Sequence, residues 1–210
     1  MSAGAGWDLT NYGVFNCDDA AAAAIAKNLT DAMGRLGCRA LVMGECGHGY
    51  QSARWMGPDW LRTRFPFPVL SVLELIDGYL GQGRITVDPS KNPQTVTLHD
   101  PCSLVRHGGV LEPQRRILRR AVSDFVEMSP CGHQNFCCGG GGGQLAMGNY
   151  KQRRLAASAV KARQIRDTGA KVVCAPCHNC IDQLMELSKE HSLGIQIKTV
   201  AELVANALVC

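Results

Sequence analysis

Short apolar runs alternate along the chain with longer amphipathic segments. Four runs, 39–44, 95–99, 171–174 and 195–197, are dominated by apolar or β-branched residues, as in strands that a parallel sheet buries on both faces. Between and beside these runs, helical spacing of apolar residues and helix-ending glycines predict helices at 17–35, 69–80, 112–128, 144–168, 177–189 and 199–208. The alternation of strands and helices predicts an α/β fold with short parallel sheets.

The order of elements in the first part of the chain matches that in the second. In both parts a helix ends at a glycine, Gly37 or Gly169, and a buried strand and a short polar segment follow. We therefore predict two pseudo-repeated Rossmann-like units, over residues 1–84 and 85–210, of which the first is incomplete. The pairing starts at residues 11–13, so the front half of the first unit is missing and we expect the chain to be part of a longer protein.

Composition narrows the classes of function. The net charge of +4 comes from interspersed charges of both signs, so nucleic acid is not an expected partner. We find no apolar run of the roughly 20 residues that span a membrane, and no signal peptide, so we expect a cytoplasmic protein. Eleven cysteines without an export signal favour metal binding or redox chemistry over structural disulfides.

The most unusual segment is 136–143, in which a phenylalanine and two adjacent cysteines precede five consecutive glycines. Ordering each glycine costs more backbone entropy than ordering any other residue, so something must hold this loop in place. A metal cluster can do so, because thiolates bind iron while backbone N–H groups without side chains approach the cluster sulfurs. Cys102 lies upstream of the loop, and Cys177 and Cys180 form a CxxC pair downstream of it.

Together these segments supply five thiols. Four thiolates fill a cubane iron–sulfur cluster or a tetrahedral zinc site, so a fifth suggests a bridging thiolate or an opened, non-cubane cluster. The alternatives are a zinc site and a smaller ligand set in which one or two of the thiols are buried and free. The predicted metal ligands are Cys102, Cys137, Cys138, Cys177 and Cys180, with Gly139 and Gly140 beside the cofactor.

These motifs resemble the cysteine-rich CCG domain shared by heterodisulfide reductase catalytic subunits, succinate:quinone reductase anchors and anaerobic glycerol-phosphate and lactate oxidation subunits. The combination of 45–48, 88–92, 99–102 and 176–180 is most similar to the DsrK-type subunit of the membrane redox complex that accompanies dissimilatory sulfite reductase. The resemblance implies a non-cubane [4Fe-4S] cluster on the five cysteines, where a disulfide- or trisulfide-type substrate is reduced or formed. The first unit is then a degenerate, N-terminally truncated CCG unit, and the second is complete.

The resemblance also implies partners and a location. We expect other subunits of a membrane redox complex, a small-protein or small-molecule disulfide as substrate, and placement on the cytoplasmic face of the membrane through a partner subunit. Two other functions stay open. One is a non-catalytic zinc or iron–sulfur scaffold module, and the other is a quinone-linked electron-transfer subunit of a dehydrogenase complex.

Several further residues have alternative interpretations. His178, inside the CxxC pair, is the first choice for a proton donor to the departing sulfur, although hydrogen bonding to a cluster sulfide fits it equally well. Positive charge near the thiolates could also come from His99, Arg106 or His107. Arg115, Arg116, Arg119 and Arg120 are interpreted as a solvated helix face, with a docking surface for an acidic partner as the alternative.

Of the six cysteines outside the predicted site, three have alternative interpretations. Cys174 could pair with Cys177, but it is expected to end a buried strand. Cys46, close to His48, could belong to a degenerate metal site, although a turn at a strand end is favoured. Cys131 is interpreted as a surface thiol or a resolving cysteine.

Overall fold

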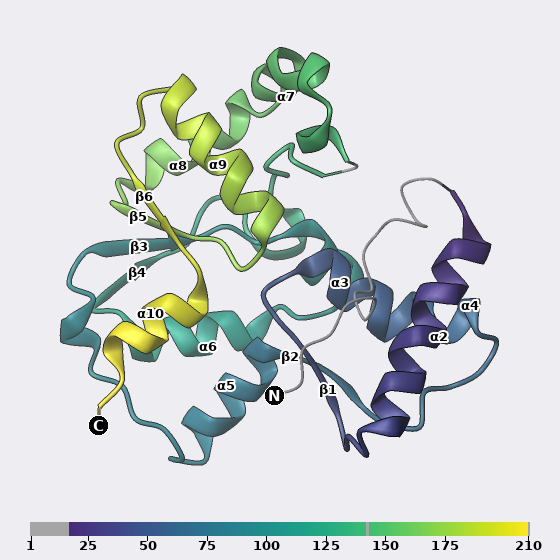
Figure 1. Cartoon of the computed structure of the whole chain (residues 1–210). Helices are drawn as coiled ribbons and strands as arrows, with labels where there is room; N and C mark the ends of the chain where they lie inside the picture. The colour runs from purple at the N-terminus through teal and green to yellow at the C-terminus, as the bar shows by residue number, and fades with distance from the viewer. Residues whose placement is uncertain (1–16, 142, 210) are drawn as a thin grey trace.

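The computed structural model describes residues 17–141 and 143–209, so the predicted start of the repeat at 11–13 lies outside the described residues. The described chain contains two parallel sheets, one of four strands in the order β4-β3-β5-β6 and one of two strands, β1-β2 (Figure 1). The strands are β1 (Leu41–Met43), β2 (Val69–Ser71), β3 (Thr95–Leu98), β4 (Asp124–Val126), β5 (Val172–Cys174) and β6 (Gln196–Lys198). The predicted α/β fold with short parallel sheets is confirmed.

Helices cover both faces of the larger sheet, with α8 and α9 on one face and α6 and α10 on the other (Figure 1). The smaller sheet lies beside α2. The α-helices are α2 (Asp19–Arg35), α3 (Gly47–Gln51), α4 (Gly57–Trp60), α5 (Val72–Gly81), α6 (Glu112–Ala121), α7 (Lys151–Ala157), α8 (Ala159–Thr168), α9 (His178–Glu190) and α10 (Val200–Ala207). No α-helix in residues 17–141 and 143–209 is both long and apolar enough to cross a bilayer.

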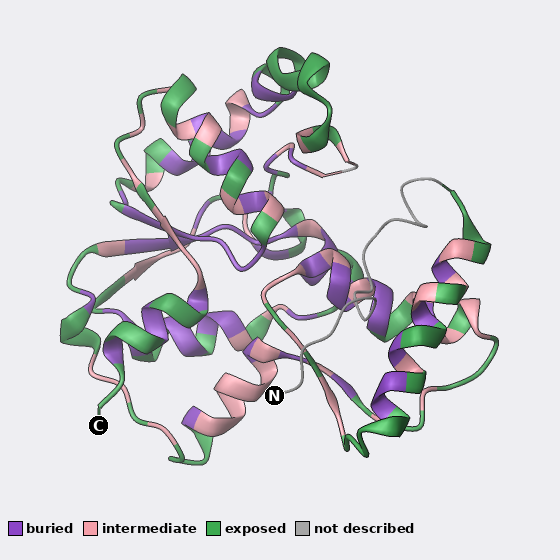
Figure 2. Ribbon diagram, in the orientation of Figure 1, coloured by how far each residue is buried: buried purple, intermediate pink, exposed green. Residues whose placement is uncertain are grey.

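Alternate residues of β5 face opposite sides of the larger sheet and belong to two different hydrophobic clusters. Val172 and Cys174 pack with the buried residues of α6 and α10. Val173 packs with those of α8 and α9. Figure 2 shows the consequence, with buried residues along the strands and on the helix faces turned toward them. β5 is therefore buried on both faces, as its unbroken apolar sequence predicts.

Side chains from both sides of the predicted boundary at 84/85 share the first of these clusters. Leu73 and Leu80 of α5 pack in the same cluster as Val96 of β3 and Ile117 of α6. A separate, smaller cluster joins α2 to β2. The division into two pseudo-repeated units, the first incomplete, stays a prediction.

The predicted extents of three helices are wrong. The segment 69–80 begins with β2, whose Val69 pairs with Leu41, before α5 starts. The helix predicted at 112–128 ends at Ala121, because Val122 is extended and leads into β4.

The third segment, predicted as one helix over 144–168, begins with 3₁₀ turns and then forms α7 and α8, which are separated at Ser158. The hydroxyl of Ser158 donates to the carbonyl oxygen of Arg154 at 2.8 Å, a local bond that competes with regular helix geometry.

Candidate metal centre

Two of the cysteine segments meet at the carboxyl edge of the larger sheet. β3 and β5 pair in parallel, with Leu98 opposite Cys174, and the backbone N–H of His99 donates to the Cys174 carbonyl oxygen at 2.8 Å. Cys102 lies four residues after the end of β3, and Cys177 caps the N-terminus of α9 after β5. The parallel pairing therefore places the Cys102 segment beside the CxxC pair, at the edge where open α/β sheets bind ligands.

The cysteine–glycine loop closes over this edge, and two of its glycines are required by its geometry. Gly139 has a φ of +88°, which side chains disfavour. A Cβ atom on Gly140 would lie 2.8 Å from the Cβ of Gln183 and 2.9 Å from the carbonyl oxygen of Asn179, both on α9. The backbone N–H groups of Gly139 and Gly140 donate to the sulfurs of Cys137 and Cys138, at 3.3 and 3.5 Å.

The five predicted thiols form an unbroken series of contacts. The sulfurs of Cys138 and Cys180 are 3.3 Å apart. Cys137 forms side-chain hydrogen bonds with both Cys102 and Cys138, and Cys177 forms one with Cys180. The structure thus brings together sulfurs from three segments that are far apart in the sequence. Cys137 is the exposed member of the set, whereas Cys138, Cys177 and Cys180 are buried.

Hydrogen bonds among the thiols divide them into two groups. The pKa of Cys137 is lowered well below its usual range because it accepts hydrogen bonds from Cys102 and Cys138. The pKa of Cys177 is lowered to about 6, chiefly by its hydrogen bond with Cys180. The pKa of the Cys102, Cys138 and Cys180 thiols is raised, first of all by their bonds to neighbouring sulfurs. Cys137 and Cys177 are therefore the first thiolates to form.

Two buried nitrogen-containing side chains lie beside the sulfurs. His99 is 1% exposed, and a ring nitrogen of it lies within 4.8 Å of the sulfurs of Cys138 and Cys180. Lys161 of α8 is fully buried, and burial lowers its pKa to about 8, while the neighbouring thiols act in the opposite direction. Sequence reasoning missed Lys161. The available signal was a lysine four residues before Ile165, on the apolar stripe of α8.

Asp100 fixes the approach to the loop. Its carboxylate forms a bidentate ion pair with Arg115 at 2.7 and 2.8 Å and accepts a hydrogen bond from the backbone N–H of Gly132 at 2.6 Å. Arg115 also pairs with Glu127, and only 5% of the residue is exposed. The interpretation of Arg115 as part of a solvated face is wrong, because this arginine turns into the protein to neutralise a buried carboxylate.

The comparisons with known proteins agree with this arrangement. The family model described as the CCG cysteine-rich domain matches residues 96–185. These residues belong to the CCG family.

The chain is 32% identical over 168 residues to one subunit of the dihydromethanophenazine:CoB–CoM heterodisulfide reductase of Methanosarcina acetivorans, a match that covers 80% of this chain and 40% of that one. It is 27% identical to the Hdr-like menaquinol oxidoreductase iron-sulfur subunit 2 of Archaeoglobus fulgidus, over 95% of this chain and 42% of that one. It is 26% identical to the EtfAB:quinone oxidoreductase of Syntrophomonas wolfei, over 72% of this chain and 20% of that one. The chain thus spans about two fifths of the length of the first two of these relatives.

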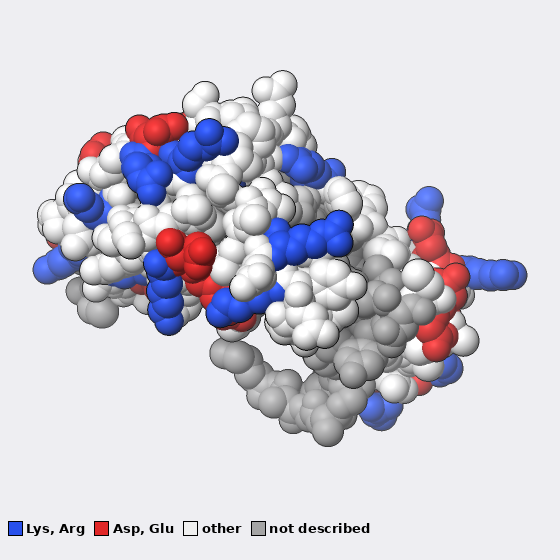
Figure 3. Space-filling model, turned by 90° about the horizontal axis from the view of Figure 1, so that it is seen from above, with Lys and Arg blue, Asp and Glu red and all other residues white. Residues whose placement is uncertain are grey.

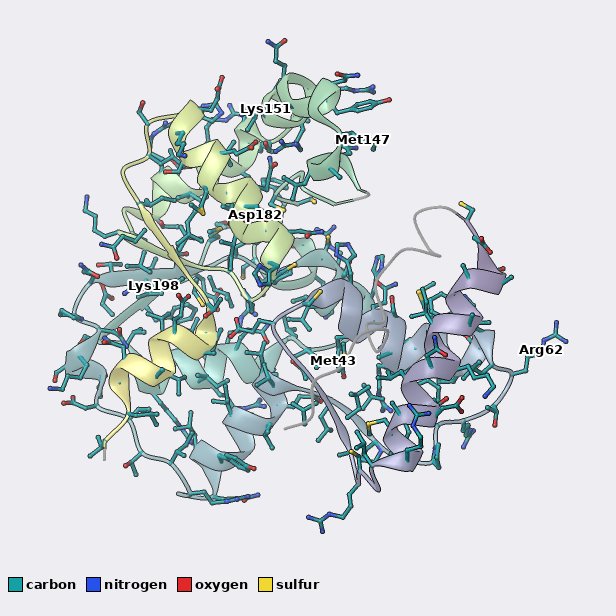
Figure 4. All side chains as sticks on the ribbon, in the orientation of Figure 1. Met43, Arg62, Met147, Lys151, Asp182 and Lys198 are labelled. Carbon is teal, nitrogen blue, oxygen red and sulfur yellow. The ribbon has the colours of Figure 1, made fainter. Side chains whose placement is uncertain are left out.

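A pocket of about 480 Å³ opens beside the cysteine–glycine loop, next to the exposed Cys137. Its lining residues come from the loop and from the segment that continues into α7. They are Cys137, Gly139, Gly141, Gln144, Tyr150, Arg153, Arg154 and Ala157. Figure 4 shows Met147 and Lys151 on this same outer segment, and Figure 3 shows positive and negative side chains interspersed over the face seen from above.

His178 lies away from this pocket. It is exposed at the first position of α9 and lines a different pocket, of about 380 Å³, together with Glu45 and Cys46. Within residues 17–141 and 143–209, no hydrogen bond joins His178 to the five thiols. Its role as a proton donor stays a prediction. Of the other proposed cations, Arg106 donates to the backbone carbonyl oxygens of His133 and Asn135, and His107 is exposed.

The remaining cysteines occupy other positions in the CCG domain and beside it. Cys174 is fully buried in β5, and burial raises the pKa of its thiol. The sulfur of Cys46 accepts a hydrogen bond from the backbone N–H of Gly49 at 3.4 Å, at the N-terminus of α3. Cys131 is half-buried immediately before the turn that Asp100 holds, and burial raises its pKa.

Proposed function

We propose that the chain is the cluster-binding part of a heterodisulfide reductase-like iron–sulfur oxidoreductase that reduces or forms a disulfide- or trisulfide-type substrate. The observation that carries this proposal is the contact series of five sulfurs at the carboxyl edge of the larger sheet. Cys102, Cys137, Cys138, Cys177 and Cys180 would hold the cluster. When bound, an iron–sulfur cluster supplies a one-electron redox centre.

The donor set and its surroundings fit such a cluster. Thiolate ligands select iron–sulfur clusters or zinc, and a fifth thiol exceeds what either zinc or a cubane cluster uses. The N–H groups of Gly139 and Gly140 already donate to two of the sulfurs, as expected beside negatively charged thiolates. These features support a non-cubane [4Fe-4S] cluster over the zinc alternative.

Access to solvent supports a reaction at the Cys137 side. Cys137 is exposed and lines the pocket of about 480 Å³, so a small molecule or a protein segment carrying a disulfide could reach it. Arg153 lines the same pocket and supplies positive charge there. By analogy with the named relatives, we propose that the chain works with other subunits of a membrane redox complex, on the cytoplasmic face of the membrane, and that DsrK-type subunits are its nearest functional counterparts.

Anaerobic purification followed by iron and acid-labile sulfide determination tests the proposal. We expect brown protein that contains both elements and gives an EPR signal on oxidation, which changes when a thiol substrate is added. Cys138→Ser should lose this signal and turnover, whereas Cys38→Ser, at an exposed position after α2, should keep both. Colourless protein that contains only zinc would refute the proposal.

A quinone-linked electron-transfer function is the second candidate, because two of the relatives are named as quinone or menaquinol oxidoreductases. It predicts electron flow from the reduced protein complex to a quinone without any disulfide acceptor. The scaffold alternative predicts that Cys138→Ser still assembles with its partner subunits and that no redox activity is lost. The same variant therefore separates all three functions when assembly, disulfide turnover and quinone reduction are measured together.

A further inference from the structure

We propose that His99 donates a hydrogen bond from its Nε2–H group to a sulfur of the bound cluster, and that Asn135 and Lys161 fix the tautomer in which it does so. The inference rests on the proposed function, because it needs a cluster on the five thiols. It adds a nitrogen-containing side chain to a site whose other contacts come from cysteines and glycines.

The orientation of the Asn135 amide is fixed by Lys161. An ammonium group only donates hydrogen bonds, and the Lys161 Nζ atom lies 2.6 Å from Asn135 Oδ1. The atom facing Lys161 must therefore be the amide oxygen. The amide nitrogen, Nδ2, is then on the other side, where it donates to the backbone carbonyl oxygen of Asp100 at 2.8 Å.

The same amide nitrogen determines the tautomer of His99. Asn135 Nδ2 lies 3.4 Å from His99 Nδ1, and because an amide nitrogen can only donate, Nδ1 must accept. Because Nδ1 accepts, it carries no hydrogen, and the ring is therefore neutral with a single N–H. That hydrogen is on Nε2.

The Nε2–H group has no partner among the described residues. It is buried, His99 is 1% exposed, and no hydrogen-bond acceptor within residues 17–141 and 143–209 reaches it. Leaving a buried donor unpaired is costly, so a native structure normally supplies a partner. A ring nitrogen of His99 lies within 4.8 Å of the Cys138 and Cys180 sulfurs, and Nδ1 is already engaged by Asn135. We assign the missing acceptor as a sulfur of the bound cluster, which Cys138 and Cys180 would hold beside the ring.

The tautomer also decides between two roles for the ring. An imidazole binds iron through a nitrogen lone pair, and in this tautomer Nε2 carries a hydrogen instead. His99 is thus assigned as a hydrogen-bond donor and not as a sixth ligand. Hydrogen bonds to cluster sulfurs tune the reduction potential, and stabilising the extra negative charge of the reduced state raises it. The buried Lys161 acts in the same direction and positions the donor through Asn135.

Two nearly equal substitutions test the assignment. In His99→Gln the side-chain amide extends as far as Nε2 did, whereas in His99→Asn it extends only as far as Nδ1. Both are compared with wild type by EPR-monitored redox titration and by ENDOR of the anaerobically purified protein, after exchange into deuterated water. We expect His99→Asn to shift the midpoint potential to a more negative value and to lose a deuterium coupling that His99→Gln retains.

A control variant and a second test variant separate the role of His99 from a general effect of substitution. His133→Gln removes an exposed imidazole and should leave the potential and the coupling unchanged. If His99→Asn does not fold, Lys161→Met provides the second test, with the same negative shift expected. An unchanged potential in a variant that retains full iron and sulfide overturns the inference, and so does a strong ¹⁵N coupling from labelled His99, which indicates an iron–nitrogen bond. Absence of iron in the wild type instead refutes the proposed function.

Discussion

Arg115 and Arg116 are neighbours on α6, yet they should respond very differently to the same substitution. The Arg115 guanidinium forms hydrogen bonds with the carboxylates of Asp100 and Glu127 and with the Leu111 carbonyl oxygen. The side chains of Arg115 and Asp100 are 6% and 1% exposed. Arg116 pairs with Asp77 at 2.6 Å, but its own side chain is 48% exposed. Replacing each arginine by methionine therefore compares a buried ion pair with an exposed one on the same helix.

The loss in free energy of unfolding depends on which charged group each substitution leaves unpaired. Arg115→Met leaves the buried Asp100 carboxylate with the Gly132 N–H but without its counter-ion, a loss that costs about 3–5 kcal/mol of the free energy of unfolding. Arg116→Met removes an exposed pair worth about 0–1 kcal/mol. At about 2–4 °C per kcal/mol for a chain of this size, Arg115→Met should lower the unfolding midpoint by about 6–20 °C.

Thermal unfolding followed by far-UV circular dichroism measures the difference, with all three proteins purified anaerobically in the same buffer. Because Asp100 holds Gly132 at the entrance to the cysteine–glycine loop, iron content should fall in Arg115→Met and remain at the wild-type level in Arg116→Met. Equal midpoints for the two variants would show that the Arg115 pair is not buried as described, and the account of Asp100 as the residue that fixes the loop would be wrong.

Three further outcomes are expected. Gly140→Ala should lose iron, because its Cβ would collide with α9, whereas Gly141→Ala has open space and should keep it; both are checked by iron determination. In the metal-free protein, the contribution of Lys161 to the free energy of unfolding should rise between about pH 8 and pH 10, because unfolding returns Lys161 from a pKa of about 8 to its ordinary 10.5, so that the unfolded state binds the extra proton. Denaturant titrations at several pH values should show that Lys161→Met lacks this rise and that the exposed Lys171→Met keeps it. Cys174→Ala should retain full iron, since this thiol is buried in β5 outside the sulfur contacts, and a loss of iron would instead make Cys174 a ligand.

Local chemistry made much of the site predictable from the sequence. A Cys-Cys-Gly triplet and a CxxC pair indicate metal-binding or redox chemistry from a few residues, and the glycine at 139 suits a positive φ that side chains disfavour. The alternation of apolar runs and amphipathic segments likewise predicts the α/β class, because each strand of the larger sheet must be covered on both faces.

What the sequence did not reveal depends on long-range packing. The segment that forms β4 was assigned to the end of a predicted helix. Its three residues, 124–126, are too few to show the alternating pattern of a strand. Arg115 has the same residue type as its exposed neighbours, and only the position of Asp100, 15 residues earlier, turns it inward. Lys161 can be buried because its ammonium group donates hydrogen bonds to Asn135 and Gln164. The periodicity of apolar residues along a helix does not predict such hydrogen bonds.

The two sides of the sulfur series differ in a way that assigns them different tasks. On the inner side, His99 and Lys161 are fully enclosed, so they can affect the charge on the sulfurs but cannot exchange anything with solvent. On the outer side, Cys137 is exposed at the edge of a pocket, so a molecule that reacts with the site can approach there. Cys137 is also a sulfur whose pKa is lowered by two neighbouring thiols, so under the proposed function a disulfide-type substrate would meet a thiolate at the exposed end of the series. Under the proposed function, the buried residues would affect the potential of the site, and the exposed Cys137 would mark where the substrate approaches.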